Sequence, residues 1–150
     1  MKINIITIGN FKSNDSYKEL FDEYKKRIKC EINLIELKTK QQNSIEEQKK
    51  FEADLLLKAR NKNNKLIVLD ERGKIISTID FQNLINKFKI DGDIDVIIGG
   101  SDGLTEEVRN QADFVMSFGK MVFPHLMVRV MIIEQLYRVY TLNNGHPYHK

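Results

Sequence analysis

Three segments of this 150-residue chain combine glycine, acidic and apolar residues in a pattern that suits the binding of a small ligand. Leu69-Asp70 ends one apolar run, Ile98–Gly103 contains three glycines after a second run, and Phe118–Pro124 follows a third. In open α/β sheets, ligands bind beyond the carboxyl ends of the strands, where glycine lets the backbone approach a ligand closely. Any single glycine is more often part of a tight turn, but two glycine-containing segments after two strands favour a binding site.

The second of these segments argues against a phosphate-bearing ligand. Gly99–Gly103 lacks the Lys-Ser/Thr pair of a P-loop and the full G-x-G-x-x-G spacing of a dinucleotide site. Asp102, Glu106 and Glu107 lie at the start of the next helix, where they complement the helix dipole but would repel a phosphate. A cationic, nucleoside-like ligand without phosphates, such as S-adenosylmethionine, suits the segment better than ATP or NAD. Acidic first turns are also common in helices that bind no ligand.

The elements that must position these segments alternate along the whole chain. Runs of β-branched and apolar residues predict five strands, and the amphipathic stretches between them predict helices. Asp70-Glu71-Arg72-Gly73 has the composition of a turn that closes the third strand. Strands separated by helices imply one α/β domain over residues 1–150, with a mostly parallel sheet of about five strands and helices on both faces. The strands are expected at 2–8, 31–37, 66–69, 94–98 and about 114–117, and the helices at about 17–28, 45–59, 81–88, from 105, and 124–140.

The last predicted helix is unusual because apolar residues cover nearly its whole circumference between Leu126 and Tyr140. Such a helix is buried on all sides, either at the centre of the core or against a second subunit, and the pattern alone favours neither. Arg129 stands among apolar neighbours, which predicts a specific anionic or carbonyl partner. Glu134 and Arg138 have the i, i+4 spacing of an ion pair.

Composition restricts the class of protein. A hydrophobic fraction of 41% and a charged fraction of 30% are typical of a soluble globular domain and argue against wholesale disorder. The only cysteine, Cys30, cannot form an internal disulfide. No apolar stretch is long enough to span a bilayer, and the first residues lack the pattern of a signal peptide. We therefore expect a cytoplasmic protein that does not associate with a membrane.

The charge is unevenly distributed between the two halves of the chain. Residues 1–75 carry a net charge of +5 and residues 76–150 a net charge of −2, which together give the overall +3. A basic half can steer a polyanion such as RNA, although solvated helix faces explain the same charge equally well. Two of the three histidines, His146 and His149, lie in the tail, but no Cys, Asp or Glu lies near them, so no metal site is expected.

Three motifs in a fixed order connect these features to a known family. They are VIIGGSDGL (Val96–Leu104), SFGKMVFPHLMVRVMIIEQLYR (Ser117–Arg138) and HPYHK (His146–Lys150), accompanied by IVLDERGK (Ile67–Lys74) and the opening strand with Gly9. In this combination the sequence resembles the ribosomal RNA large subunit methyltransferase H family. These are SPOUT-class enzymes that methylate N3 of a pseudouridine, at position 1915 of 23S rRNA, on the assembled 70S ribosome. The resemblance implies a SPOUT-type α/β fold with a C-terminal trefoil knot, a homodimer and S-adenosylmethionine as cofactor.

The resemblance also assigns roles to particular residues. Arg129 is a candidate for holding a phosphate or the carbonyl oxygens of the uracil ring, because its guanidinium presents a planar fork of donors. Because the N3 proton of that ring is weakly acidic, a base or a stabiliser of the ring anion would help the reaction. Tyr148 and His149 are candidates for that role, from the same subunit or from its partner. Cofactor binding is assigned to Leu69, Gly99, Phe118, Gly119, Lys120, Met121, Val122 and Phe123.

Two features depart from the family pattern. Asn10-Phe11-Lys12 stands where many relatives have a lysine directly after the glycine, and residues 39–44 are shorter than in several relatives. Both lie outside the cofactor segments, so they bear on contacts with RNA rather than on activity. One rival hypothesis is an inactive RNA-binding protein with the same fold, which the intact Phe118–Phe123 loop disfavours. The other is a nucleotide-binding α/β protein unrelated to RNA, which the missing phosphate motif disfavours.

Overall fold

A computed structural model describes residues 1–150, and it contains one five-stranded sheet in which every strand pair is parallel. The order in the sheet is β2-β1-β4-β3-β5. The number of strands and the parallel sheet predicted from the sequence are confirmed. Because all the strands run in one direction, the loops that follow them meet at one edge of the sheet. The strands are β1 (Lys2–Ile8), β2 (Glu31–Leu37), β3 (Lys65–Ile75), β4 (Ile94–Ile98) and β5 (Phe114–Ser117).

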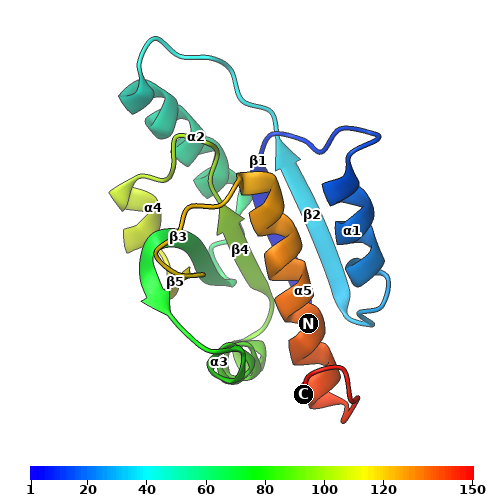
Figure 1. Cartoon of the computed structure of the whole chain (residues 1–150). Helices are drawn as coiled ribbons and strands as arrows, with labels where there is room; N and C mark the ends of the chain where they lie inside the picture. Colours follow the sequence, from blue (N-terminus) through cyan, green and yellow to red (C-terminus); the bar gives the residue numbers. More distant parts are fainter.

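Five helices cover both faces of this sheet (Figure 1), as predicted. The alternation of side chains along a strand produces the two layers. In β1, Ile3 and Ile5 belong to the core beneath α1, α3 and α5, whereas Ile6 and Ile8 face α2 and α4. The helices are α1 (Ser16–Lys25), α2 (Ile45–Ala59), α3 (Thr78–Asp91), α4 (Glu106–Asn110) and α5 (His125–Asn143).

Side-chain caps determine where most of the helices begin. Asp15, Ser44 and Thr105 each accept a hydrogen bond from a backbone N–H in the first turn of α1, α2 and α4. Ser77 and Asp80 form a reciprocal capping box at the start of α3. These caps limit the length of the loops between strands and helices.

β3 is longer than its apolar run, and Asp70-Glu71-Arg72-Gly73 is not the turn that its composition predicts. Leu69 and Lys74 both lie opposite Met116 of β5, so the four residues between them bulge out and the strand then resumes. A Cβ atom on Gly73 would lie 2.6–2.8 Å from backbone atoms of Val115 and Met116. Glycine is therefore required at position 73 because the bulge passes directly over β5.

α5 lies at the centre of one layer, packed between α1 and α3 (Figure 1). Eight of its residues are buried within this single chain, and Ile132 and Ile133 are 0% exposed. The apolar circumference of this helix is therefore explained by its central position. A contact between subunits would have to use side chains that this chain leaves partly exposed, such as Met127 and Met131. The trefoil knot and the homodimer stay predictions of the resemblance.

Candidate functional site

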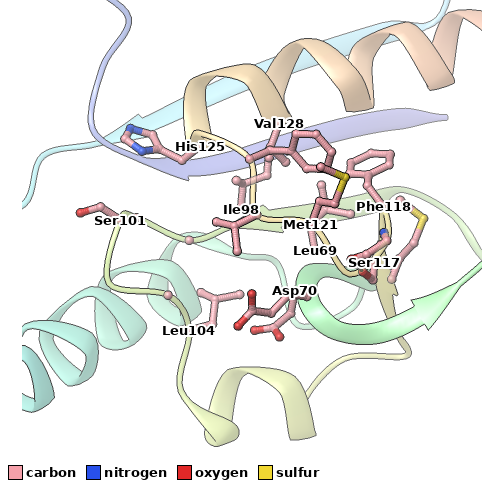
Figure 2. Close-up of a pocket in the computed structure, with 18 of the residues that line it drawn as sticks. Leu69, Asp70, Ile98, Ser101, Leu104, Ser117, Phe118, Met121, His125 and Val128 are labelled. Carbon is pink, nitrogen blue, oxygen red and sulfur yellow. Dashed lines mark hydrogen bonds between the residues drawn. The ribbon is translucent and has the colours of Figure 1, made fainter.

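The three segments singled out in the sequence meet at one cavity of about 390 Å³ (Figure 2). It lies at the carboxyl edge of the sheet, between the end of β3, the loop after β4 and the loop from β5 to α5. This volume is in the range of small-molecule sites in proteins. The convergence that the sequence predicts is confirmed. The cavity is lined by Leu69–Glu71, Ile98–Leu104, Met116–Gly119, Met121–Phe123, His125 and Val128.

The lining of the cavity is apolar and acidic. Asp70, Glu71 and Asp102 contribute carboxylates, and no lysine or arginine lines the cavity. Leu69 and Phe123 supply apolar walls on which a flat ring can pack. Charges of one sign in a cleft favour ligands of the opposite sign, so the cavity suits a cationic ligand and disfavours a phosphate.

An ion pair holds the floor of the cavity in place. The Asp70 carboxylate lies 3.1 Å from Arg109 Nη1, and both side chains are largely buried. The same Nη1 donates to the carbonyl of Leu104 at 2.9 Å. Arg109 of α4 thereby ties the β3 bulge to the loop after β4, so two walls of the cavity are fixed relative to each other.

The loop after β5 is shaped by a local exchange of hydrogen bonds. Ser117 Oγ donates to the carbonyl of Gly119 at 2.7 Å, and the Gly119 N–H donates back to Ser117 Oγ at 3.0 Å. Gly119 has φ of +128°, a conformation that residues with a side chain rarely adopt. The backbone of this loop is therefore held open along the cavity wall.

Gly99 makes room for a neighbour in the cavity wall. A Cβ atom on Gly99 would lie 2.7 Å from Leu104 Cδ2, and Leu104 itself lines the cavity. A side chain at position 99 would therefore displace Leu104 and change the shape of the wall from behind.

Most of the residues to which the resemblance assigns cofactor binding lie together around this cavity. Lys120 is the exception, because its side chain is exposed and does not line the cavity. Arg129, Tyr148 and His149 also lie outside the lining. The residues that do line it are Leu69, Gly99, Phe118, Gly119, Met121, Val122 and Phe123.

Arg129 finds the carbonyl partners that its isolated position predicts. Its side chain is 0% exposed, and Nη2 donates to the carbonyls of Ile8 at 2.7 Å and Gly9 at 3.0 Å. Glu36 lies 3.6 Å from Nη1, and the guanidinium packs over the Phe11 ring. Burial lowers the pKa of Arg129, and the Glu36 carboxylate opposes this shift. In this chain Arg129 anchors the end of β1 and is not positioned to hold a substrate phosphate.

The C-terminal tail is packed against the end of α5. Tyr148 donates to Glu134 Oε1 at 3.2 Å, and burial raises the pKa of its phenol. Glu134 also forms the ion pair with Arg138 that the spacing predicts, at 2.6 Å. Arg138 Nη1 lies 3.1 Å from His149 Nδ1. Because a guanidinium only donates hydrogen bonds, His149 Nδ1 is the acceptor, and the proton of the neutral ring lies on Nε2.

The C-terminus lies beside the last turns of α5 (Figure 1), whereas the cavity lies at the first turn of this helix. His125 and Val128 line the cavity at the start of the helix, whereas Tyr148 and His149 contact residues of its second half. Glu134, which Tyr148 contacts, lies six residues after Val128, or about 9 Å along the helix. Neither Tyr148 nor His149 lines the cavity of its own chain.

His125 is a further cavity residue, outside the set that the sequence motifs assign to the cofactor. It is the first residue of α5, it is half-buried, and it lines the cavity near Ser101 (Figure 2). Burial lowers the pKa of its imidazole, the charge of Arg129 lowers it further, and the Glu52 carboxylate opposes both. Its position directly after the Phe118–Pro124 segment was the signal that could have identified it.

Comparison with known proteins identifies the family of this cavity-bearing fold. The family described as "Predicted SPOUT methyltransferase" matches residues 1–149. The chain belongs to the SPOUT methyltransferase family. It is 41% identical over 160 residues to a Ribosomal RNA large subunit methyltransferase H of Clostridium botulinum (strain Okra / Type B1), with 100% of both chains covered. It is 37% identical over 152 residues to the protein of the same name from Rhodospirillum centenum, covering 100% of this chain and 99% of that one.

A solved structure supports the same fold. A probable methylase family protein from Haemophilus influenzae Rd KW20 superposes with a TM-score of 0.61 over 99% of this chain and 70% of that chain. The two sequences are only 15% identical, so this likeness concerns the fold alone. Together with the parallel five-stranded sheet, the comparisons confirm the SPOUT α/β fold and the resemblance drawn from the sequence motifs.

Two further observations concern a membrane and a metal ion. None of the helices combines the length and the apolar character that a membrane crossing requires. No three His, Cys, Asp or Glu side chains are grouped so that they could hold a metal ion.

Proposed function

We propose that this SPOUT methyltransferase transfers a methyl group from S-adenosylmethionine to N3 of a pseudouridine in 23S rRNA, in the cytoplasm and on the assembled 70S ribosome. The observation that carries the proposal is the cavity itself. It joins Leu69, Gly99 and the Phe118–Phe123 loop, and it is acidic without any basic residue. The relatives named Ribosomal RNA large subunit methyltransferase H support the choice of substrate.

The residues around the cavity fit S-adenosylmethionine. A sulfonium cation suits a lining that contains Glu71 and Asp102 and no Lys or Arg. The backbone of the Phe118–Phe123 loop, opened at Gly119, offers amides and carbonyls to an adenine ring, while Leu69 and Phe123 offer apolar contact. When bound, the cofactor supplies an electrophilic methyl group. The task of the protein is then to hold the uracil N3 in line with that group.

Basic residues near the cavity suit the approach of RNA. Lys12 follows β1, and Lys38 and Lys40 follow β2, so all three lie in loops at the sheet edge that carries the cavity. Each of them is exposed. Their charges favour binding of a polyanion whose reactive base enters the cavity. This arrangement supplies the phosphate contacts that the buried Arg129 does not make.

A homodimer is part of the proposal because neither Tyr148 nor His149 lines the cavity of its own chain. In a two-fold dimer, the tail of one subunit can approach the cavity of the other. His149 then presents an Nε2–H donor to the uracil ring, and Tyr148 presents a hydroxyl. Met121 and Val122, which are 76% and 81% exposed, provide apolar surface beside the cavity for such a contact. The trefoil knot belongs to the same proposal.

A pair of glycines allows a matched test of the cavity. Gly119 and Gly92 have φ of +128° and +135°, and neither has an atom near the position of an added Cβ. Gly119→Ala and Gly92→Ala therefore impose a similar backbone strain, but only Gly119 lines the cavity. Calorimetry should give micromolar binding of S-adenosylmethionine for the wild type and Gly92→Ala, roughly −8 kcal/mol, and at least ten-fold weaker binding for Gly119→Ala. Equal affinities in the two variants would remove the cavity from the proposal.

The substrate is tested by methyl transfer from labelled S-adenosylmethionine to 70S ribosomes, 50S subunits and naked 23S rRNA in parallel. The proposal expects incorporation into 70S ribosomes at N3 of a pseudouridine. Transfer to naked rRNA alone would refute the ribosomal substrate. Cofactor binding without any transfer would instead support the inactive RNA-binding alternative.

A further inference from the structure

A buried carboxylate lies directly behind the cavity wall. Glu52 of α2 is 5% exposed. Its Oε1 accepts hydrogen bonds from Gln48 Nε2 at 3.0 Å and Thr39 Oγ1 at 3.2 Å. Its Oε2 is equally buried and has no hydrogen-bond partner. A buried carboxylate oxygen without a donor is costly, so its presence calls for an explanation.

The free oxygen of Glu52 is turned toward the cavity wall. A Cβ atom on Gly100 would lie 2.8 Å from Oε2, so the carboxylate contacts the backbone of Gly100 with no side chain in between. Gly100 itself lines the cavity. Thr39 and Gln48 hold the other oxygen, which fixes the direction of Oε2. The Glu52 carboxylate therefore lies directly behind the part of the cavity wall that Gly100 forms.

His125 is the cavity residue on which this charge acts. Its imidazole makes no hydrogen bond in the structure and lies at the end of the cavity near Ser101 (Figure 2). The charged groups that act on it are Glu52 from α2 and Arg129 one turn along α5, and Asp102 of the loop after β4 lines the same cavity. Burial and Arg129 lower the pKa of His125, and Glu52 raises it. The imidazole is thus neutral near pH 7 and is able to accept a proton.

We propose that His125 is the catalytic base that accepts the N3 proton, and that the buried Glu52 carboxylate stabilises its protonated form across the cavity wall. This inference rests on the proposed function. The N3–H bond breaks and its proton forms a bond to an imidazole nitrogen of His125. The N3 electron pair bonds to the methyl carbon, the carbon–sulfur bond breaks, and its electrons leave with a neutral sulfur. The imidazolium then returns its proton to water.

The tail histidine is less suited to this role. Arg138 occupies Nδ1 of His149, and the remaining nitrogen carries the proton. His149 therefore has no free acceptor as it is docked here, whereas His125 has both nitrogens free of protein partners.

The coupling between the two residues is measurable without substrate or cofactor. The chain has only three histidines, so NMR titration of the imidazoles resolves each one, and His125→Asn identifies the His125 signal. Glu52→Gln should lower the pKa of His125 and leave those of His146 and His149 unchanged. Glu46→Gln, an exposed glutamate on the same helix, should leave all three unchanged. An unchanged His125 pKa in Glu52→Gln would overturn the pairing.

Methyl transfer to 70S ribosomes tests the catalytic step. His125→Asn should bind S-adenosylmethionine within a few-fold of wild type and lose at least ~10²-fold in kcat. In Glu52→Gln the acid limb of the pH–rate profile should move to lower pH by the amount seen in the NMR titration. In Glu52→Asp, which keeps a carboxylate, the limb should lie between those of Glu52→Gln and wild type. Full activity of His125→Asn beside an active wild type would overturn this inference alone. An inactive wild type would instead refute the proposed function.

Discussion

Replacement of Arg129 by methionine tests whether this residue acts in folding or in catalysis. Methionine fills a similar space in the core but donates no hydrogen bond. The substitution leaves the carbonyls of Ile8 and Gly9 without their shared donor and leaves Glu36 without its nearest cation. Because the Arg129 side chain is 0% exposed, water does not take its place.

The size of the effect follows from these partners. Each hydrogen bond to a charged group contributes about 1.5–3 kcal/mol, and removal of one partner of a buried ion pair costs about 3–5 kcal/mol. The Glu36 side chain is 25% exposed and also accepts from the Phe11 N–H at 2.6 Å, so it is partly compensated. We therefore expect Arg129→Met to lower the free energy of unfolding by about 3 kcal/mol. Arg129→Lys, which keeps one donor and the charge, should lose less.

Urea unfolding followed by circular dichroism measures this difference. Protein concentration must be held fixed, because a dimer gains apparent stability with concentration. The opposite result would be a free energy of unfolding within about 0.5 kcal/mol of wild type, normal cofactor binding and no methylation of ribosomes. In that case Arg129 is a catalytic residue. That result would refute the anchoring role derived from its buried position.

Two further substitutions test other parts of the fold. Gly73→Ala should lower the free energy of unfolding by about 2–3 kcal/mol, because its Cβ would overlap the backbone of β5, whereas Lys74→Ala next to it should have little effect in the same urea assay. Burial lowers the folded-state pKa of His125 below its unfolded value, so the unfolded chain binds this proton first as the pH falls. Stability should therefore decrease below about pH 6.5, and His125→Gln should reduce that decrease in urea titrations between about pH 7 and 5.

The sequence predicted the layers of this fold well because they depend on local patterns. Alternating apolar residues such as those of β1 and β4 determine which face of a strand is buried. The convergence of the three ligand segments followed from the same patterns, since parallel strands end at one edge. Capping residues such as Ser44 and Ser77 are equally local and mark the helix starts.

The features that were missed depend on contacts between residues that are distant in the sequence. The bulge at Asp70–Gly73 has the composition of a turn. It differs from a turn only in that β3 pairs with β5 again after it. The packing of Arg129 could not be predicted from local patterns because its carbonyl partners, Ile8 and Gly9, lie about 120 residues away. The position of Glu52 behind the cavity wall could not be predicted for the same reason, because its unpaired oxygen faces Gly100 in the loop after β4.

The separation of cavity and tail along α5 leads to a test with mixed subunits. Deletion of Tyr148–Lys150 should leave cofactor binding within a few-fold of wild type and lower methyl transfer by at least ~10²-fold, because it removes tail groups but no cavity residue. Gly119→Ala should instead lose cofactor binding, because its cavity is altered while its tail is intact. In a two-fold dimer with tails acting on the partner's cavity, a heterodimer of these two variants contains one complete site.

Random mixing of the two inactive variants makes half of the dimers mixed. Each mixed dimer has one working site of two, so the whole mixture should recover about a quarter of the wild-type activity and the isolated mixed dimers about half. Subunits are exchanged by co-expression with two affinity tags, and the doubly tagged fraction is assayed on 70S ribosomes. A mixed fraction that stays as inactive as either parent would mean that each tail serves the cavity of its own chain. That outcome would also require the tail to leave its contacts with Glu134 and Arg138 and to move about 9 Å along α5 toward Val128.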